Sequence, residues 1–301
     1  MNETWSASAA AASSAIIAGA SIVATRFVVG QTDPLSLAFY RFALASLCFL
    51  PLVIVALREK AVNPRDLVVI AGLGTLFFGF FPWAFSASLN YTTAGRGAVG
   101  IATIPIATLL LSFVFGREHV SAQKVIGVVL AFFGVAIAFG DALISKKNAG
   151  DYLFGDALML VAAFIAAIYT VFARPYLERY GPLVVTGLAM VLGALAIAML
   201  KVSIGDLTDF PRFSASGWFA VLFLGIVGGA IQWGLYTWAL RWISPVSVAV
   251  FATLTPISAV ILANVILGEA LTVWLILGLV LVIAAIFVAN IPTSVGRKGP
   301  H

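Results

Sequence analysis

The sequence predicts an all-helical polytopic membrane protein in which ten transmembrane helices form two inverted repeats of five helices each. Three observations lead to this fold class: an apolar composition, ten long apolar stretches and an internal repeat. Of the 301 residues, 62% are hydrophobic and only 10% are charged, whereas soluble domains average about 45–50% apolar and about 25% charged residues. A water-soluble fold of this length cannot bury so many apolar side chains, so that class is excluded.

A transmembrane helix needs about 20 consecutive, mostly apolar residues, and ten stretches of the chain meet this need. Proline opens three of them, at Pro34, Pro182 and Pro245, where a helix loses nothing from the missing N–H. The stretches are long and unbroken, unlike the short alternating strands of a membrane barrel, so helices are predicted. The ten stretches cover residues 9–29, 34–57, 67–89, 94–115, 121–140, 153–173, 182–200, 217–240, 245–267 and 271–291.

The distribution of lysine and arginine predicts the orientation, because these residues are enriched in cytoplasmic loops. If the N-terminus is cytoplasmic, the inside segments carry ten of the 17 lysines and arginines, the outside segments carry six, and Arg41 lies within a span. This asymmetry favours a multi-pass protein with both termini in the cytoplasm. Residues 293–301 are expected to form a disordered tail.

The two halves of the chain repeat one pattern. A shift of 151 residues places Gly74 on Gly225, Pro105 on Pro256 and Glu118 on Glu269, and a proline followed thirteen residues later by a glutamate is hard to obtain by chance. The repeats are expected at residues 1–145 and 150–292. Five spans per half is an odd number, so the second half must enter the membrane from the opposite side. Such inverted repeats are typical of secondary transporters, whose substrate site lies near the midplane between the repeats.

These residues also resemble a known family. The runs Ser88-Leu-Asn-Tyr-Thr-Thr-Ala-Gly95, Ile104-Pro105 and Gly116-Arg-Glu118, with the second copy at Thr255-Pro256 and Gly268-Glu269, resemble the EamA pattern of the drug/metabolite transporter superfamily. Arg41 resembles the second-helix arginine that is common in this family. The resemblance covers nearly the whole chain and implies a ten-helix transporter of small metabolites, most similar to YddG-like exporters of aromatic and hydrophobic amino acids.

Several kinds of chemistry are disfavoured by missing residue types. One cysteine and two histidines are too few for a disulfide framework, a thiolate metal cluster or a zinc site, so no metal, cofactor or catalytic residue is expected and the protein is not predicted to be an enzyme. No Asp or Glu lies in the middle of a predicted span, and Asp156, Glu118 and Glu269 are expected at helix ends. This pattern disfavours proton–cation exchange through an embedded carboxylate. The positive charges are dispersed over short loops, so a nucleic-acid partner is not expected.

The candidate site is an aromatic-walled cavity with few polar groups, as is typical of small-molecule sites. Pro105 and Pro256 lie about eleven residues into their spans, near the bilayer centre, and are expected to kink them. Arg41 is interpreted as a structural or gating residue, although it could also hold a substrate carboxylate. The small residues on the same helix faces could instead serve helix packing. The expected lining residues are Ser21, Phe78, Phe81, Trp83, Phe85, Tyr169, Gln232, Trp233, Tyr236 and Thr253.

The favoured function is the export or facilitated passage of aromatic and other hydrophobic amino acids by alternating access. An exporter of drugs, nucleosides or other small metabolites is the alternative within transport, and a non-transporting membrane scaffold or receptor is the alternative outside it. The expected partners are the amino-acid substrate and the lipid bilayer, and a monomer is favoured.

Overall fold

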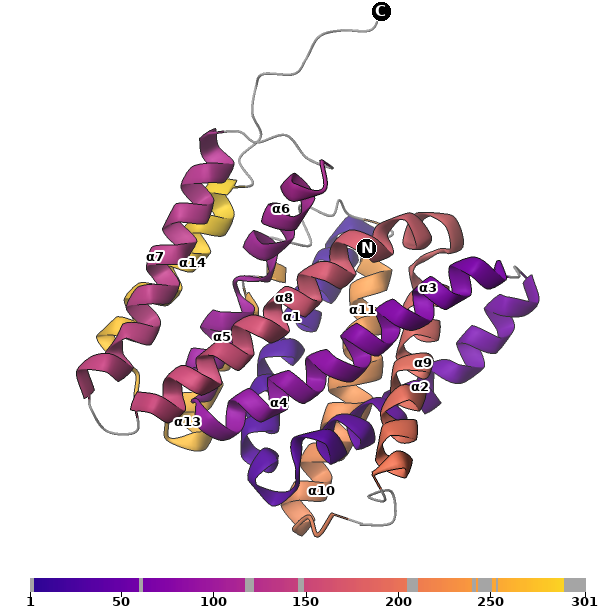
Figure 1. The fold of residues 1–301 in the computed structure, drawn as a ribbon, viewed down its shortest axis with the longest axis horizontal. Helices are drawn as coiled ribbons and strands as arrows, with labels where there is room; N and C mark the ends of the chain where they lie inside the picture. Colours follow the sequence, from indigo (N-terminus) through magenta and orange to yellow (C-terminus); the bar gives the residue numbers. More distant parts are fainter. Residues whose placement is uncertain are drawn as a thin grey trace, which may run out of the picture.

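The computed structural model describes residues 3–59, 62–116, 122–145, 149–204, 211–239, 242, 251–252 and 254–289. All regular secondary structure in these residues is helical (Figure 1). The α-helices are α1 (Glu3–Val28), α2 (Pro34–Glu59), α3 (Pro64–Gly74), α4 (Phe81–Tyr91), α5 (Ala94–Ile101), α6 (Ile104–Val114), α7 (Ala122–Ser145), α8 (Ala149–Tyr180), α9 (Pro182–Ser203), α10 (Ala215–Leu222), α11 (Gln232–Ala239), α13 (Leu254–Leu267) and α14 (Val273–Ala289).

Within these described residues, seven helical segments are long and apolar enough to cross a membrane, and three shorter apolar helices coincide with the other predicted stretches. The long segments are Trp5–Gln31, Pro34–Val55, Pro64–Tyr91, Ala94–Val114, Gly150–Tyr180, Pro182–Ser203 and Ala215–Ala239, and the shorter ones are Val125–Phe139, Leu254–Leu267 and Val273–Val288.

Helix α2 begins at the predicted proline, and the residue before it supplies the cap. Asp33 Oδ1 accepts hydrogen bonds from the backbone N–H groups of Leu35 at 2.9 Å and Ser36 at 2.8 Å. Partial burial raises the pKa of Asp33, but these bonds, the Ser36 side chain and the Lys201 charge outweigh it and hold the pKa below its usual value. The Asp-Pro pair therefore starts the helix as its chemistry predicts.

The third and eighth spans each contain a π-helical segment, η2 (Thr75–Phe80) between α3 and α4 and η3 (Phe223–Ile231) between α10 and α11. A shift of 151 residues carries residues 75–80 onto 226–231, so the two π-helical segments occupy equivalent places in the two halves. The 3.6-residue periodicity that predicts a spanning helix does not distinguish a π-helical segment from an α-helical one.

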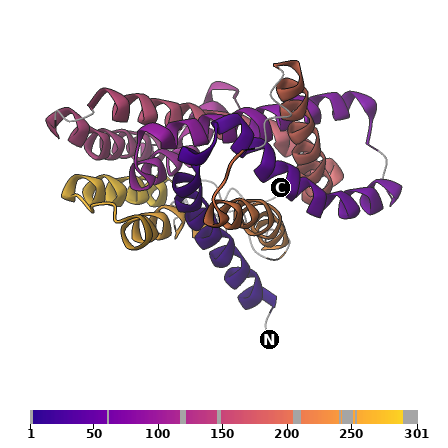
Figure 2. The same ribbon diagram turned by 90° about the horizontal axis from the view of Figure 1, so that it is seen from below.

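The packing of helices has the same form in both halves. Helix α1 packs on α11 and α13, and its counterpart α8 packs on the counterparts of those helices, α4 and α6. The pair α7 and α14 lies at one end of the molecule, and α2 lies with α9 at the other (Figures 1 and 2). Exchanging the two halves therefore maps the main helix pairs onto one another.

Small residues allow the closest of these approaches. A Cβ at Gly74 would lie 2.7 Å from Ala189 Cα on α9, and a Cβ at Gly225 would lie 2.6 Å from Leu44 Cβ on α2. Gly74 and Gly225 are the pair that the internal repeat superposes. The glycines thus let the third span meet the seventh, and the eighth meet the second, at a distance that a larger residue would prevent.

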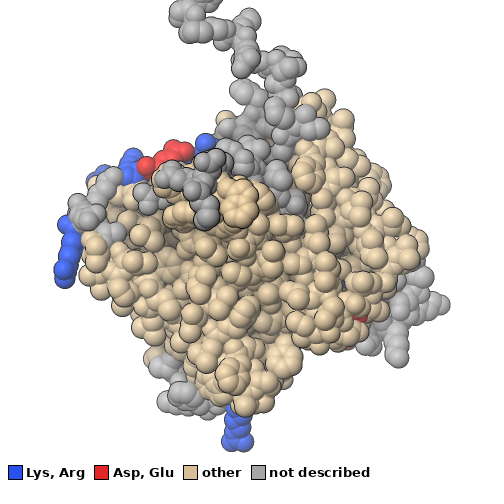
Figure 3. All heavy atoms as spheres, turned by 180° about the vertical axis from the view of Figure 1, so that it is seen from behind, with Lys and Arg blue, Asp and Glu red and all other residues tan. Residues whose placement is uncertain are grey.

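The outer surface is apolar over a wide area. Figure 3 shows charged side chains at the margins of the molecule and a broad uncharged face between them. Large side chains on the surface include Val68 at 72%, Phe132 at 71% and Phe219 at 74% exposed. Contiguous apolar surface of this extent is far larger than a soluble monomer exposes, and it suits contact with lipid.

Candidate functional site

Aromatic side chains from both halves meet beside the two π-helical segments. Phe77 and Phe78 of η2 contact Trp233, which lies just after η3, with ring centroids 5.8 and 5.9 Å apart. Phe77 also stacks on Tyr169 of α8 at 4.4 Å. Since π-helical turns occur frequently at functional sites, their pairing here marks the region as the candidate site.

We call these rings the aromatic cluster. Their centroid distances of 4.4–5.9 Å fall close to the range in which edge and stacked aromatic pairs attract one another. The cluster has flat apolar faces and three polar groups, the hydroxyls of its two tyrosines and the indole N–H of Trp233. Its members are Phe42, Phe77, Phe78, Phe81, Phe85, Tyr169, Trp233 and Tyr236.

Six of the ten lining residues predicted from sequence belong to the aromatic cluster, namely Phe78, Phe81, Phe85, Tyr169, Trp233 and Tyr236. Sequence reasoning missed Phe77 and Phe42. Phe77 lies four residues before Phe81, so helical spacing counted back from Phe81 would have found it. Phe42 follows Arg41 and has no comparable periodic signal.

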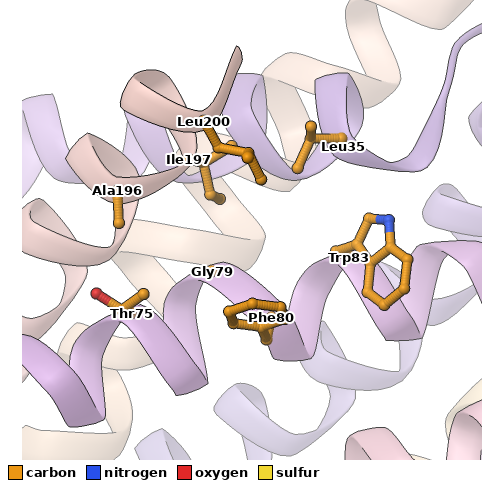
Figure 4. A pocket seen from close by; sticks show the side chains of 8 residues that line it. All are labelled: Leu35, Thr75, Gly79, Phe80, Trp83, Ala196, Ile197 and Leu200. Atoms are coloured by element: carbon orange, nitrogen blue, oxygen red, sulfur yellow. The ribbon is translucent and has the colours of Figure 1, made fainter. Parts of the chain in front are cut away.

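Of the other predicted lining residues, Gln232 precedes Trp233 in the chain, and Ser21 and Trp83 make contacts outside the aromatic cluster. Ser21 donates to the Ile17 carbonyl of its own helix at 2.9 Å and packs against Gly228. Trp83 borders a separate groove of about 280 Å³ between α2, η2, α4 and α9 (Figure 4). Thr253 lies outside the described residues. The groove is lined by Leu35, Thr75, Gly79, Phe80, Trp83, Ala196, Ile197 and Leu200.

Three buried polar atoms have no hydrogen-bond partner among the described residues: Tyr169 OH in the aromatic cluster, Arg41 Nε next to Phe42 in the chain, and Gln232 Oε1 next to Trp233. Thr186 lies near the Tyr169 hydroxyl. Buried polar groups in proteins are nearly always paired, and leaving one unpaired costs about 1–3 kcal/mol. Tyr236 contacts Trp233 with ring centroids 5.6 Å apart and keeps 36% of its surface exposed. These atoms therefore suit water or a polar ligand held against aromatic walls.

The fourth span is broken directly before Pro105. Helix α5 ends at Ile101 and α6 begins at Ile104, and the Thr103 hydroxyl donates to the Gly100 carbonyl at 2.6 Å in the gap. The expected kink is a two-residue turn in which Ala102 and Thr103 keep right-handed helical backbone angles, and the proline lies in the first turn of the next helix. In the second half, α13 begins two residues before Pro256.

A buried ion pair joins α5 to α8. Arg96 pairs with both oxygens of Asp156 and donates to the carbonyls of Ala138 and Phe139, while Thr92 Oγ1 donates to Asp156 Oδ1 at 2.7 Å. The expectation that Asp156 lies at a helix end is wrong, because α8 starts earlier than the predicted span and contains it. Because Arg96 and Asp156 lie 60 residues apart in the sequence, no local sequence pattern predicts that they pair.

Glu269 connects the two halves at one end of the molecule. Its carboxylate accepts from the backbone N–H groups of Ala94 at 2.9 Å and Gly95 at 3.1 Å, the first residues of α5. Arg26 lies 3.8 Å from the same carboxylate and donates to the Leu89 carbonyl. Glu269 is expected at a helix end of its own half, but it lies between α13 and α14 and instead caps the start of α5 in the other half. Glu118 lies outside the described residues.

Comparison with known proteins identifies similar chains over nearly the full length. The family model of EamA-like transporters matches residues 5–140 and 153–291. An uncharacterized transporter of Archaeoglobus fulgidus is 29% identical over 271 residues, which is 90% of this chain and 93% of that protein. The uncharacterized transporter YyaM of Bacillus subtilis is 24% identical, over 91% of this chain and 90% of its own. A solved crystal structure at 20% identity has the same fold, with a TM-score of 0.63 over 95% of this chain and 96% of that chain.

Proposed function

Since the chain belongs to the EamA-like transporter family, we propose that this membrane transporter exports or facilitates the passage of aromatic and other hydrophobic amino acids. The observation that carries the proposal is the aromatic cluster, with unpaired polar atoms of Arg41, Tyr169 and Gln232 beside it. Small-molecule sites combine apolar walls with a few placed polar groups in this way. An apolar side chain would pack on the rings, and the amino-acid head group would meet the polar atoms.

The charge of the site supports a zwitterionic substrate. Within the described residues, no Asp or Glu side chain forms an ion pair with Arg41. A transported cation would need an embedded carboxylate, and a phosphorylated anion would need several cations, because isolated charges are costly in a membrane. One cation and an amide suit a solute with one negative and one positive group.

We further propose that ten spans form two inverted repeats, residues 1–145 and 150–292, with both termini cytoplasmic in a bacterial inner membrane and a monomer as the working unit. The matching helix pairs, the two π-helical segments and the paired Gly74 and Gly225 contacts support the repeat. In inverted-repeat transporters, the substrate site lies at the interface of the repeats, and the aromatic cluster draws its rings from both halves.

Alternating access gives the Glu269 contact a place in the transport cycle. The contact ties the link before α14 to α5, and through Arg26 to α1 and α4. We propose that it closes one end of the path in this conformation. Substrate would leave at that end only after the carboxylate had separated from the start of α5.

Counterflow of labelled phenylalanine into proteoliposomes tests the function. Wild-type protein is expected to give saturable uptake that unlabelled tyrosine, tryptophan and leucine reduce and nucleosides do not. Trp233→Ala should weaken uptake at least about tenfold, because it removes a ring from the aromatic cluster, whereas Trp274→Ala, which changes an exposed ring on α14, should not. Uptake no greater than that of empty vesicles would refute the proposal, and competition by nucleosides or drugs alone would favour the metabolite-exporter alternative.

A further inference from the structure

We infer that Arg41 anchors the carboxylate of the substrate, so that the site selects aromatic compounds with a free carboxylate. The inference rests on the proposed function and names the group that one end of the substrate must carry. Arg41 lies seven residues after the start of α2, about 10 Å into the span. A guanidinium at such depth is costly unless it is paired or hydrated.

The other interior cations of the described residues all have protein partners. Arg96 pairs with Asp156, Arg26 lies beside Glu269, and the Lys201 ammonium donates to the Ser36 hydroxyl. Arg41 stands apart: no hydrogen bond or ion pair to a described residue is formed by its guanidinium, and its Nε is buried without an acceptor. Across the described part of the chain, the fold thus leaves one interior cation available.

The position of this cation relates it to the aromatic cluster. The guanidinium lies 5.2 Å from the centroid of the Phe42 ring, and Phe42 contacts Phe78 at 5.3 Å, which in turn contacts Trp233. Gly225 packs against the backbone of Arg41 and presents no side chain there. The charge therefore lies beside Phe42, one ring of the aromatic cluster.

Guanidinium and carboxylate groups are matched in shape, because two parallel N–H donors meet two oxygens. On this inference, the ring of a bound ligand lies against the aromatic cluster and its carboxylate reaches Arg41, whose guanidinium is 5.2 Å from the Phe42 ring. The unpaired Gln232 oxygen is an acceptor, and an ammonium is a donor that could satisfy it. Aromatic ring, carboxylate and ammonium together describe an aromatic amino acid.

Binding to purified wild-type protein in detergent, measured by calorimetry, tests the inference without any substitution. The four ligands are phenylalanine, phenylalanine amide, phenethylamine and 3-phenylpropionate. Phenylalanine should bind at least about tenfold more tightly than its amide or phenethylamine, a difference of about 1.4 kcal/mol. Equal affinity for phenylalanine and its amide would overturn the role of Arg41 and leave the proposed transport function intact.

Variants then connect the preference to the residue. Arg41→Gln should abolish the discrimination between phenylalanine and its amide, and Arg41→Lys should restore part of it, since lysine keeps the charge but loses the planar pair of donors. Arg174→Gln, which changes an exposed arginine of α8, should bind all four ligands as the wild type does. An Arg41→Gln protein that still binds phenylalanine more tightly than its amide would overturn the inference.

The ligand set also separates this inference from the proposed function. If 3-phenylpropionate binds in a manner that depends on Arg41 but phenylalanine does not bind, the role of Arg41 in holding a carboxylate is supported and the assignment of amino acids as substrates is refuted. If neither phenylalanine nor 3-phenylpropionate binds, both the role of Arg41 and the proposed function are refuted.

Discussion

The Asp156→Asn substitution removes one negative charge from the buried pair with Arg96 while leaving the shape of the side chain nearly unchanged. Asp156 is 2% exposed and Arg96 is 7% exposed, so water cannot replace the lost charge. Removing one partner of a buried ion pair costs about 3–5 kcal/mol, because the other charge stays buried and uncompensated.

The surrounding bonds place this substitution at the lower end of that range. The amide oxygen of the introduced asparagine could still accept from Thr92, and the guanidinium keeps the carbonyls of Ala138 and Phe139. The loss is therefore the charge-assisted part of the bonds from Arg96, and we expect the free energy of unfolding to fall by about 3 kcal/mol. The corresponding fall in Tm is about 6 °C or more.

Thermal unfolding of the purified protein in detergent measures this loss. The matched control is Asp151→Asn, which removes the same charge from an exposed position near the start of the same helix and should change the free energy by no more than about 0.5 kcal/mol. If Asp156→Asn has the same Tm as the Asp151→Asn control, the reasoning that the substitution leaves the buried Arg96 charge without a partner is refuted.

Three further substitutions test contacts elsewhere in the fold. Glu269→Gln removes the charge beside Arg26 and the start of α5 and should lower the free energy of unfolding by about 1–2 kcal/mol; a melting temperature equal to that of the wild type would contradict the capping role. Gly74→Val forces a side chain against α9 at 2.7 Å and should lower the free energy of unfolding by about 1–3 kcal/mol. The control Gly72→Ala faces open space and should change that free energy by no more than about 1 kcal/mol. Equal losses of stability in the two variants would argue against close packing at Gly74. The pKa of Asp33 is lower in the folded than in the unfolded state, so its stabilising effect is present above about pH 4 and is lost as the pH falls through the folded value. The gap in Tm between wild type and Asp33→Asn should therefore be open at about pH 7 and should narrow as the pH falls below about 4, and a gap that does not change with pH would contradict this reasoning.

The positions of the spanning helices could be predicted from the sequence because each is a local property. Twenty apolar residues must satisfy their backbone groups within one helix in a membrane, and Pro34 with Asp33 before it starts α2 by chemistry that involves only neighbours. The resemblance of the two halves could also be read directly, since Gly74, Pro105 and their counterparts 151 residues later are visible as letters.

Most of the aromatic cluster was predicted for the same reason. Phe78, Phe81 and Phe85 lie on one face at helical spacing, which a sequence displays. Trp83 lies two residues from both Phe81 and Phe85 within α4, so α-helical periodicity turns it away from their face, and it borders the separate groove instead.

Only the tertiary structure decided which charges meet. Arg96 and Asp156, or Glu269 and the start of α5, are joined by packing of helices that lie far apart in the chain, and their pairing depends on the angle and depth at which those helices cross. It also decided that Arg41 Nε would be buried without a partner among the described residues. Hydropathy and helical period are set by neighbours a few residues apart, whereas the partner of a buried charge is set by the whole bundle.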